Sequence, residues 1–263
     1  MSRKSITAFA LAAIFFAVPA LAQKSKDTLR VAFYDPIPGV DIIYDPKGET
    51  AFTGHAVFDT LIAYNPDTRE FEPLLATSWK RVNPTTYEFK LRQDVKFHDG
   101  SAFTADDVAY TLNWVSDPKV KFRIKSRFLW IKGAKKVDRY TVRITTKGPR
   151  AVALARIASS IPMLPSDAHG KMAKKPAFGK KPIGTGPYKV VSYDPNDGIR
   201  LVLNKDYKHG APSKPAGTIA NVHVKQIPDI QTQVAQLLTG GVDMIHNVPK
   251  DQAENLALDP RLL

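Results

Sequence analysis

Hydrophobic and polar residues alternate most regularly in the stretch TYEFKLRQDVKFHDG, which begins at Thr86. A period of two places one face of a strand in a core and the other face in water, so this pattern predicts a half-buried strand or strand pair. Trp79 lies just before this stretch, and we expect its side chain to be buried. The apolar positions are Tyr87, Phe89, Leu91, Val95 and Phe97, and the even positions from 88 to 96 are all charged.

Short β-rich runs and helical spacings alternate along the rest of the chain, which predicts an α/β protein. The predicted strands are Thr28–Phe33, Tyr140–Thr145, Tyr188–Tyr193, Ile199–Leu203, Val222–Ile227 and Val242–Ile245. The predicted helices are Thr53–Ile62, a helix capped by Thr104, Ala151–Ser159, and a helix that begins at Asp229 and ends before Gly240. Thr104 is followed by Asp107 as third helical residue, which nearly matches a capping box.

A glycine pair, Gly184 and Gly186, precedes the predicted strand Tyr188–Tyr193 and looks like the start of a phosphate-binding loop. A dinucleotide fingerprint requires a third glycine three residues further on and a helix after it. Lys189 occupies that position, and Pro187 removes a backbone donor. The sequence therefore favours a tight backbone turn over a nucleotide site.

The first residues have the pattern of a secretory signal peptide. Arg3 and Lys4 precede an apolar run from Ile6 to Val18, and a small-residue cleavage site ends at Ala22. As a helix this run would span only about 20 Å, which is too short for a hydrocarbon core of about 30 Å. We therefore expect residues 1–22 to be removed during export to the periplasm. No cysteine follows the cleavage point, which excludes a lipid-anchored mature form.

The charge and the lack of cysteine narrow the classes of function. Cleavage would leave 263 − 22 = 241 residues and, with two cations lost, lower the formal net charge from +13 to +11. The cations are scattered and do not form a nucleic-acid-binding module with interleaved aromatic residues, so we expect no nucleic-acid partner. A chain without cysteine has no disulfides, no thiolate catalysis and no cysteine-ligated metal.

The sequence shows no recognisable catalytic constellation. It has no Gly-x-Ser-x-Gly elbow, and no two of its six histidines lie three to five residues apart, as zinc-hydrolase motifs require. His98 and Asp99 are interpreted as a polar turn, because geometry rather than adjacency makes an acid–base pair. Asp106 and Asp107 fall in a first helical turn, where carboxylates offset the helix dipole. We predict a protein that is not an enzyme, with no cofactor and no bound metal.

Three long stretches carry a family resemblance. They are ATSWKRVNPTTYEFKLRQDVKFHDGSAFTADDV from Ala76, PIGTGPYKVVSYDP from Pro182, and NKDYKHGAPSKP followed by IPDIQTQVAQLLTGGVDM. Together they resemble the extracellular solute-binding proteins of ABC transporters, family 5, the dipeptide- and oligopeptide-binding type. The resemblance covers Leu29 to Pro260, and Lys208 stands where the family usually has tryptophan.

The resemblance implies an α/β fold, namely one lobe of the type II periplasmic-binding-protein fold, with mixed sheets and flanking helices. It assigns residues 23–50 and 180–263 to a split domain and residues 51–179 to an inserted domain. The segment around Gly184 would then return the chain to the split domain. The family's second lobe would follow Leu263, so we expect an N-terminal fragment or a truncated gene product.

The resemblance also implies a function: capture of a small solute in the periplasm and delivery to an ABC permease and its ATPase. Peptides are the first expectation, while nickel, haem, opines and oligosaccharides stay open, and we expect a monomer. Binding residues are expected in loops on the scaffold. The candidate cleft residues are Phe33, Tyr34, Asp35, Tyr44, Ser159 and Ser160. The aromatic residues could instead belong to the core, and the serines could cap a helix.

Other classes of function stay open on the sequence alone. A basic secreted protein that binds polyanions would lose affinity steeply with salt. A secreted hydrolase would show turnover in an assay panel. A truncated fragment without function is a further alternative.

The leader pattern predicts that the mature protein begins at Gln23. N-terminal sequencing of exported protein tests this directly. An intact Met1 on the exported protein would contradict the prediction.

Overall fold

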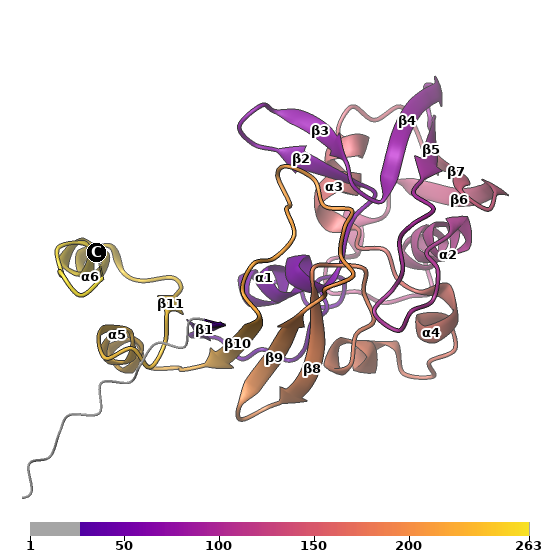
Figure 1. Ribbon diagram of the computed structural model, residues 1–263. Coiled ribbons are helices and arrows are strands. Elements are labelled where there is room, and N and C mark those ends of the chain that lie inside the picture. Colours follow the sequence, from indigo (N-terminus) through magenta and orange to yellow (C-terminus); the bar gives the residue numbers. More distant parts are fainter. Residues whose placement is uncertain (1–26, 263) are drawn as a thin grey trace, which may run out of the picture.

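The computed structural model describes residues 27–262, so the expected leader lies outside the described residues. The strands form a five-stranded sheet, a four-stranded sheet and a two-stranded hairpin. Figure 1 shows the four-stranded sheet and the hairpin on one side of the molecule and the five-stranded sheet on the other. No helix within residues 27–262 is long and apolar enough to cross a membrane.

The five-stranded sheet combines strands from the two ends of the described chain. Its order is β11 (Met244–Ile245), β1 (Thr28–Phe33), β10 (Asn221–Gln226), β9 (Gly198–Leu203) and β8 (Tyr188–Asp194). β1 runs parallel to both β10 and β11, and the other neighbours are antiparallel. β1, the first strand of the described chain, therefore lies between β10 and β11, which come from its C-terminal part.

The four-stranded sheet is antiparallel throughout and comes from one continuous stretch. Its order is β4 (Ala76–Asn83), β5 (Thr86–Leu91), β7 (Thr141–Thr146) and β6 (Ile131–Asp138), and the hairpin joins β2 (Ile62–Asn65) to β3 (Glu70–Pro73). The α-helices are α1 (Gly48–Val57), α2 (Ala105–Ser116), α3 (Ala153–Ser160), α4 (Ser166–Gly170), α5 (Ile230–Leu238) and α6 (Lys250–Ala257). Short 3₁₀ turns lie at Lys125–Arg127 and Lys175–Lys180.

The two large sheets share one hydrophobic core. Val31 and Val224 of the five-stranded sheet belong to the same buried cluster as Phe89 and Val142 of the four-stranded sheet. α2 packs against β6 and β7. Because apolar burial is the dominant favourable term in folding, this continuous core couples the stability of the two sheets.

Elements with strong local signals lie where the sequence predicts them. β1 and β8 begin at the predicted residues, and α5 begins after its cap Asp229. Thr104 and Asp107 form the capping box: the Thr104 backbone N–H donates to Asp107 Oδ2 at 2.9 Å. The predicted helix over Thr53–Ile62 is wrong in its bounds, because α1 ends at Val57. The apolar residues after Val57 are buried in an irregular segment that leads into β2, and helical spacing alone does not distinguish such a segment from a helix.

The expectation that Trp79 is buried is wrong, because its side chain is only half-buried. Trp79 lies on β4, an edge strand, and its ring stacks on Phe89 with centroids 6.4 Å apart. Edge strands are covered on fewer sides than central ones, so a large aromatic residue there keeps one face in solvent.

The glycine pair allows close backbone approach. A Cβ on Gly184 would lie 2.0 Å from the Val57 carbonyl oxygen, and one on Gly186 would lie 2.6 Å from that of Ala56. The Gly186 N–H donates to the Val57 carbonyl at 2.9 Å. The segment thus crosses the end of α1, bends at residues 185–187 and leads into β8, as the sequence predicts.

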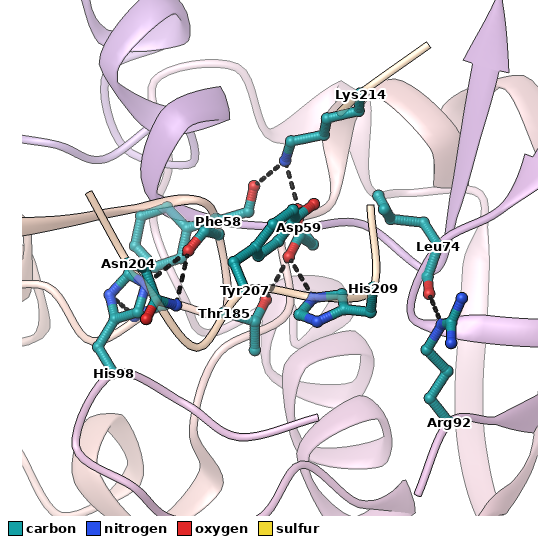
Figure 2. A network of polar contacts seen from close by, with 12 residues as sticks. Phe58, Asp59, Leu74, Arg92, His98, Thr185, Asn204, Tyr207, His209 and Lys214 are labelled. Carbon is teal, nitrogen blue, oxygen red and sulfur yellow. Dashed lines mark hydrogen bonds and ion pairs between the residues drawn. The ribbon is translucent and has the colours of Figure 1, made fainter. Parts of the chain in front are cut away.

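A buried carboxylate, Asp59, lies at this crossing (Figure 2). Its Oδ1 accepts from Lys214 Nζ at 2.5 Å, and its Oδ2 accepts from Thr185 Oγ1 and contacts His209 Nε2, each at 3.0 Å. The Tyr207 hydroxyl donates to Oδ1 at 3.3 Å. Burial alone would raise the pKa of Asp59, but Lys214 and His209 together outweigh it and hold the pKa well below its ordinary value. The carboxylate is therefore ionised and joins three segments of the chain.

His98 holds the same crossing from the other side (Figure 2). Its Nδ1 accepts from the Gly184 N–H at 3.2 Å, and its Nε2 lies 3.0 Å from the Gly186 carbonyl oxygen. This pattern fits the neutral imidazole that carries its proton on Nε2. Burial lowers the pKa of His98 to about 4, although the Gly186 carbonyl acts in the opposite direction.

We predict that Asp59→Asn destabilises the fold by about 3–5 kcal/mol, because it leaves the Lys214 charge without its buried partner. Urea denaturation gives the free energy of unfolding. Asp67→Asn, which removes an exposed carboxylate, is the matched control and should stay within about 0.5 kcal/mol of the wild type. Equal stability of the two variants would contradict the proposed importance of Asp59.

We also predict that His98 makes stability depend on acid pH. Its folded pKa lies below its unfolded value, so the stability is fully present above pH 6.5 and is lost as pH falls toward 4. The loss should reach about 3 kcal/mol at pH 4.

His98→Asn keeps an acceptor near Nδ1 but does not titrate, so its stability should fall less steeply over this range. His169, with a pKa lowered to about 4 by burial, and Asp41, with a pKa raised to about 6 by burial, titrate in both proteins and cancel in the comparison. Parallel stability curves for the wild type and His98→Asn from pH 7 to pH 4 would refute the role of His98.

Candidate ligand-binding site

The parallel strands β1, β10 and β11 end on the same edge of the five-stranded sheet. In open α/β sheets, ligands bind outside the carboxyl ends of the parallel strands. We call this region the carboxyl edge; it consists of residues 33–35, 226–227 and 245–247. Three of the residues predicted to bind ligand, Phe33, Tyr34 and Asp35, lie on it.

Phe33, Tyr34 and Asp35 differ in their exposure to solvent. Phe33 is only 1% exposed and packs against the rings of Phe52 and His246, at centroid distances of 5.7 and 5.3 Å. Tyr34 is 56% exposed, and its carbonyl accepts from Gln226 Nε2 at 3.1 Å. Asp35 is also exposed. Tyr34 and Asp35 are thus accessible to a solute, while Phe33 supports the edge from below.

Tyr44 lies apart from this edge. Its ring packs against Trp114 and Phe122, and burial raises its pKa to about 12, with a smaller contribution from Asp41. It lines a hollow of 550 Å³ with residues 173–177 and Lys180.

A second cleft, of 410 Å³, lies between α1, α3 and the segment 124–127. We call it the α1–α3 cleft; it is lined by Ile42, Pro46, Ala51, His55, Ile124, Ser126, Arg127, Arg156 and Ser159. The exposed Ser159 side chain faces this cleft and donates to the Ala155 carbonyl at 2.8 Å. Ser160 is buried, 3.1 Å from Ser159 between hydroxyl oxygens. α1 connects the two regions, because its Phe52 touches Phe33 while Ala51 and His55 face the cleft.

Sequence reasoning missed the two arginines of this cleft. Arg127 Nη1 donates to the Ile42 carbonyl at 3.2 Å, and partial burial together with the neighbouring Arg156 lowers the pKa of Arg127. Arg156 stands three residues before Ser159 on a predicted helix, so the two share one helix face. That spacing was a usable signal for Arg156, whereas Arg127 comes from an irregular segment.

The described residues show no group of three or more histidine or acidic side chains placed to hold a metal ion. The Thr185 hydroxyl and the His209 imidazole both contact Asp59.

Comparison with known proteins agrees with this architecture. The model of the bacterial extracellular solute-binding proteins, family 5 Middle, matches residues 70–263. Di/tripeptide-binding protein 2 of Pseudomonas aeruginosa is 28% identical over 263 residues, which cover 89% of this chain and 49% of that protein. Oligopeptide-binding protein AppA of Bacillus subtilis is 27% identical over 260 residues, which cover 90% and 46%.

Solved structures show the same likeness. AppA of Bacillus subtilis in complex with a nonapeptide has a TM-score of 0.78 at 26% identity, over 88% of this chain and 46% of that one. AgaA of A. tumefaciens R10 in complex with agropinic acid has a TM-score of 0.78 at 28% identity, over 89% and 46%. The chain spans about half the length of the relatives it matches.

The mixed sheets and flanking helices therefore define a lobe with the type II periplasmic-binding-protein fold. The chain belongs to the bacterial extracellular solute-binding proteins, family 5.

Proposed function

We propose that this chain serves in the solute-binding component of an ABC importer, which captures a peptide or a related small solute and delivers it to the membrane permease. The observation that carries the proposal is the accessible carboxyl edge, with Tyr34 and Asp35, on the scaffold of this family. The leader pattern of residues 1–22 supports work in the periplasm after export. Binding without chemical conversion is the activity that this edge supports.

The domain division follows as part of the proposal. The five-stranded sheet takes strands from residues 28–33 and 188–245, and the four-stranded sheet takes strands from residues 76–146. This arrangement supports a split domain over residues 23–50 and 180–263, interrupted by an inserted domain over residues 51–179. The shared core and the Asp59 contacts join the two domains.

Peptides are the solute that the relatives support best. The names of relatives include di/tripeptide-binding, glutathione-binding and oligopeptide-binding proteins, and one is a heme-binding protein. We propose that Tyr34 and Asp35 contact the solute directly, and that Phe33 positions Tyr34. Tyr44 and Ser159, which line separate hollows, are proposed as contacts outside this surface, and the buried Ser160 is proposed to position Ser159.

The mechanism we propose is that of a clamp in which these residues form one wall. A solute held by one wall keeps part of its hydration and lacks the free energy of closure, so it binds weakly. We expect dissociation constants for short peptides in about the millimolar range, whereas a two-walled relative should reach about micromolar or tighter. One wall alone is therefore expected to form a specific but weak binding site. We propose that the protein is a monomer.

We predict that di- and tripeptides shift the backbone NMR signals of Tyr34 and Asp35 in the chain that starts at Gln23. Tyr34→Ala and Asp35→Asn should weaken this binding about three- to tenfold, because each removes an accessible contact. Tyr64→Ala, at another exposed tyrosine, on the hairpin, should leave binding unchanged.

Recovery of the peptides intact would agree with a binding protein. Absence of any shift at the carboxyl edge, or cleavage of the peptides, would refute the proposal. Shifts caused by a polyanion such as heparin, and abolished by salt, would favour the polyanion-binding alternative.

A further inference from the structure

The α1–α3 cleft carries more positive charge than its surroundings neutralise. Arg127 and Arg156 both line it, and neither guanidinium has a carboxylate within 4.0 Å among residues 27–262. The Arg156 guanidinium makes no hydrogen bond to any residue within 27–262, while its backbone N–H donates to the Val152 carbonyl, and the Arg127 side chain uses one donor on the Ile42 carbonyl. Most of their donors are therefore available to a molecule that enters the cleft.

The acidic residues near the cleft are occupied elsewhere. Asp45 accepts from Arg123 Nη1 at 3.1 Å. Asp41 Oδ1 accepts from the backbone N–H groups of Ile43 and Tyr44, at 2.9 and 3.0 Å. These carboxylates stabilise the segment before α1 and do not neutralise the two arginines. Like charges in one cleft repel each other, and a bound anion would remove that penalty.

We propose that the α1–α3 cleft is an anion subsite that binds the carboxylate group of a small solute through Arg127 and Arg156. The guanidinium fork matches two oxygens of a carboxylate or phosphate, and two such forks can hold one charged group from two sides. The Ser126 hydroxyl lies at the same surface, and the Ser159 hydroxyl, which donates to the Ala155 carbonyl, leaves its oxygen facing the cleft. The inference rests on the proposed function, because it names the chemistry of the solute.

The other residues that line the α1–α3 cleft indicate which further chemical groups the solute should have. Ile42, Pro46, Ala51 and Ile124 give the cleft apolar walls, and its volume is 410 Å³. Pockets of this kind bind small molecules mainly by apolar contact and orient them with a few polar groups. The solute should therefore combine an anionic end with an apolar or aliphatic body. A short peptide with a free carboxyl terminus meets this description, and so does a small dicarboxylic acid.

The test is calorimetry and NMR titration of the chain from Gln23 with three probes at low salt: succinate, inorganic phosphate, and succinamide as the uncharged match of succinate. Succinate should bind and succinamide should not. Arg127→Gln and Arg156→Gln should each weaken succinate about tenfold, the loss expected for a charged hydrogen-bonded contact. Arg139→Gln, at an exposed arginine between β6 and β7, is the control and should bind succinate as the wild type does.

Thermal unfolding of each variant checks that the fold is intact. Tighter binding of phosphate than of succinate, lost in both cleft variants, would support the anion subsite and identify phosphate as its preferred group. Equal binding of succinate by the wild type and by the double variant Arg127→Gln/Arg156→Gln would overturn the proposal. Failure of both anions to bind the wild type would overturn it as well.

The peptide experiment separates this inference from the proposed function. If peptides bind at Tyr34 and Asp35 but amidation of their carboxyl terminus changes nothing and the cleft variants bind normally, the anion subsite is refuted and the solute-binding role stands. If no peptide binds while succinate still depends on Arg127 and Arg156, the anion subsite stands and the peptide role is refuted.

Discussion

The ionised carboxylate of Asp59 is the constraint on which the arrangement of the lobe depends. A buried charge without partners costs several kcal/mol, so Lys214, His209 and Thr185 must be in place together. This requirement fixes the end of α1 against the glycine crossing and against the loop that follows β9. α1 also carries Phe52, below the carboxyl edge, and His55, in the α1–α3 cleft. The contacts of Asp59 therefore help to position both candidate binding surfaces.

Local signals explain which parts of the fold could be predicted. The Thr104 capping box and the start of β8 depend on residues within a few positions of each other, and both are found as expected. The end of α1 and the exposure of Trp79 depend on neighbours that the sequence pattern does not identify. The partners of Asp59 lie 126 to 155 residues away along the chain, so no periodicity or motif in the sequence predicts these contacts.

In the candidate site, too, local signals predict some residues, while others depend on contacts between distant segments. Tyr34 and Asp35 could be named because they follow a strand, and the structure leaves both accessible. The α1–α3 cleft could not be named, because its lining comes from three separate segments that meet only in the folded chain. Its two arginines are unremarkable in a basic sequence. We infer their role from the lack of a carboxylate within 4.0 Å of either guanidinium in the described part of the chain, and only the three-dimensional arrangement reveals this lack.

The pairing of β1 has a consequence for the kinetics of folding. Thr28 lies opposite Asn221, which is 221 − 28 = 193 residues further along the chain, and the other neighbour of β1 is later still. Closing so long a loop is entropically costly, and folds with such distant contacts form slowly. The four-stranded sheet can assemble from its own continuous stretch, but β1 has two unpaired edges until β10 and β11 arrive. An unpaired strand edge favours aggregation, so the newly made chain is most vulnerable during the interval before its last strands dock.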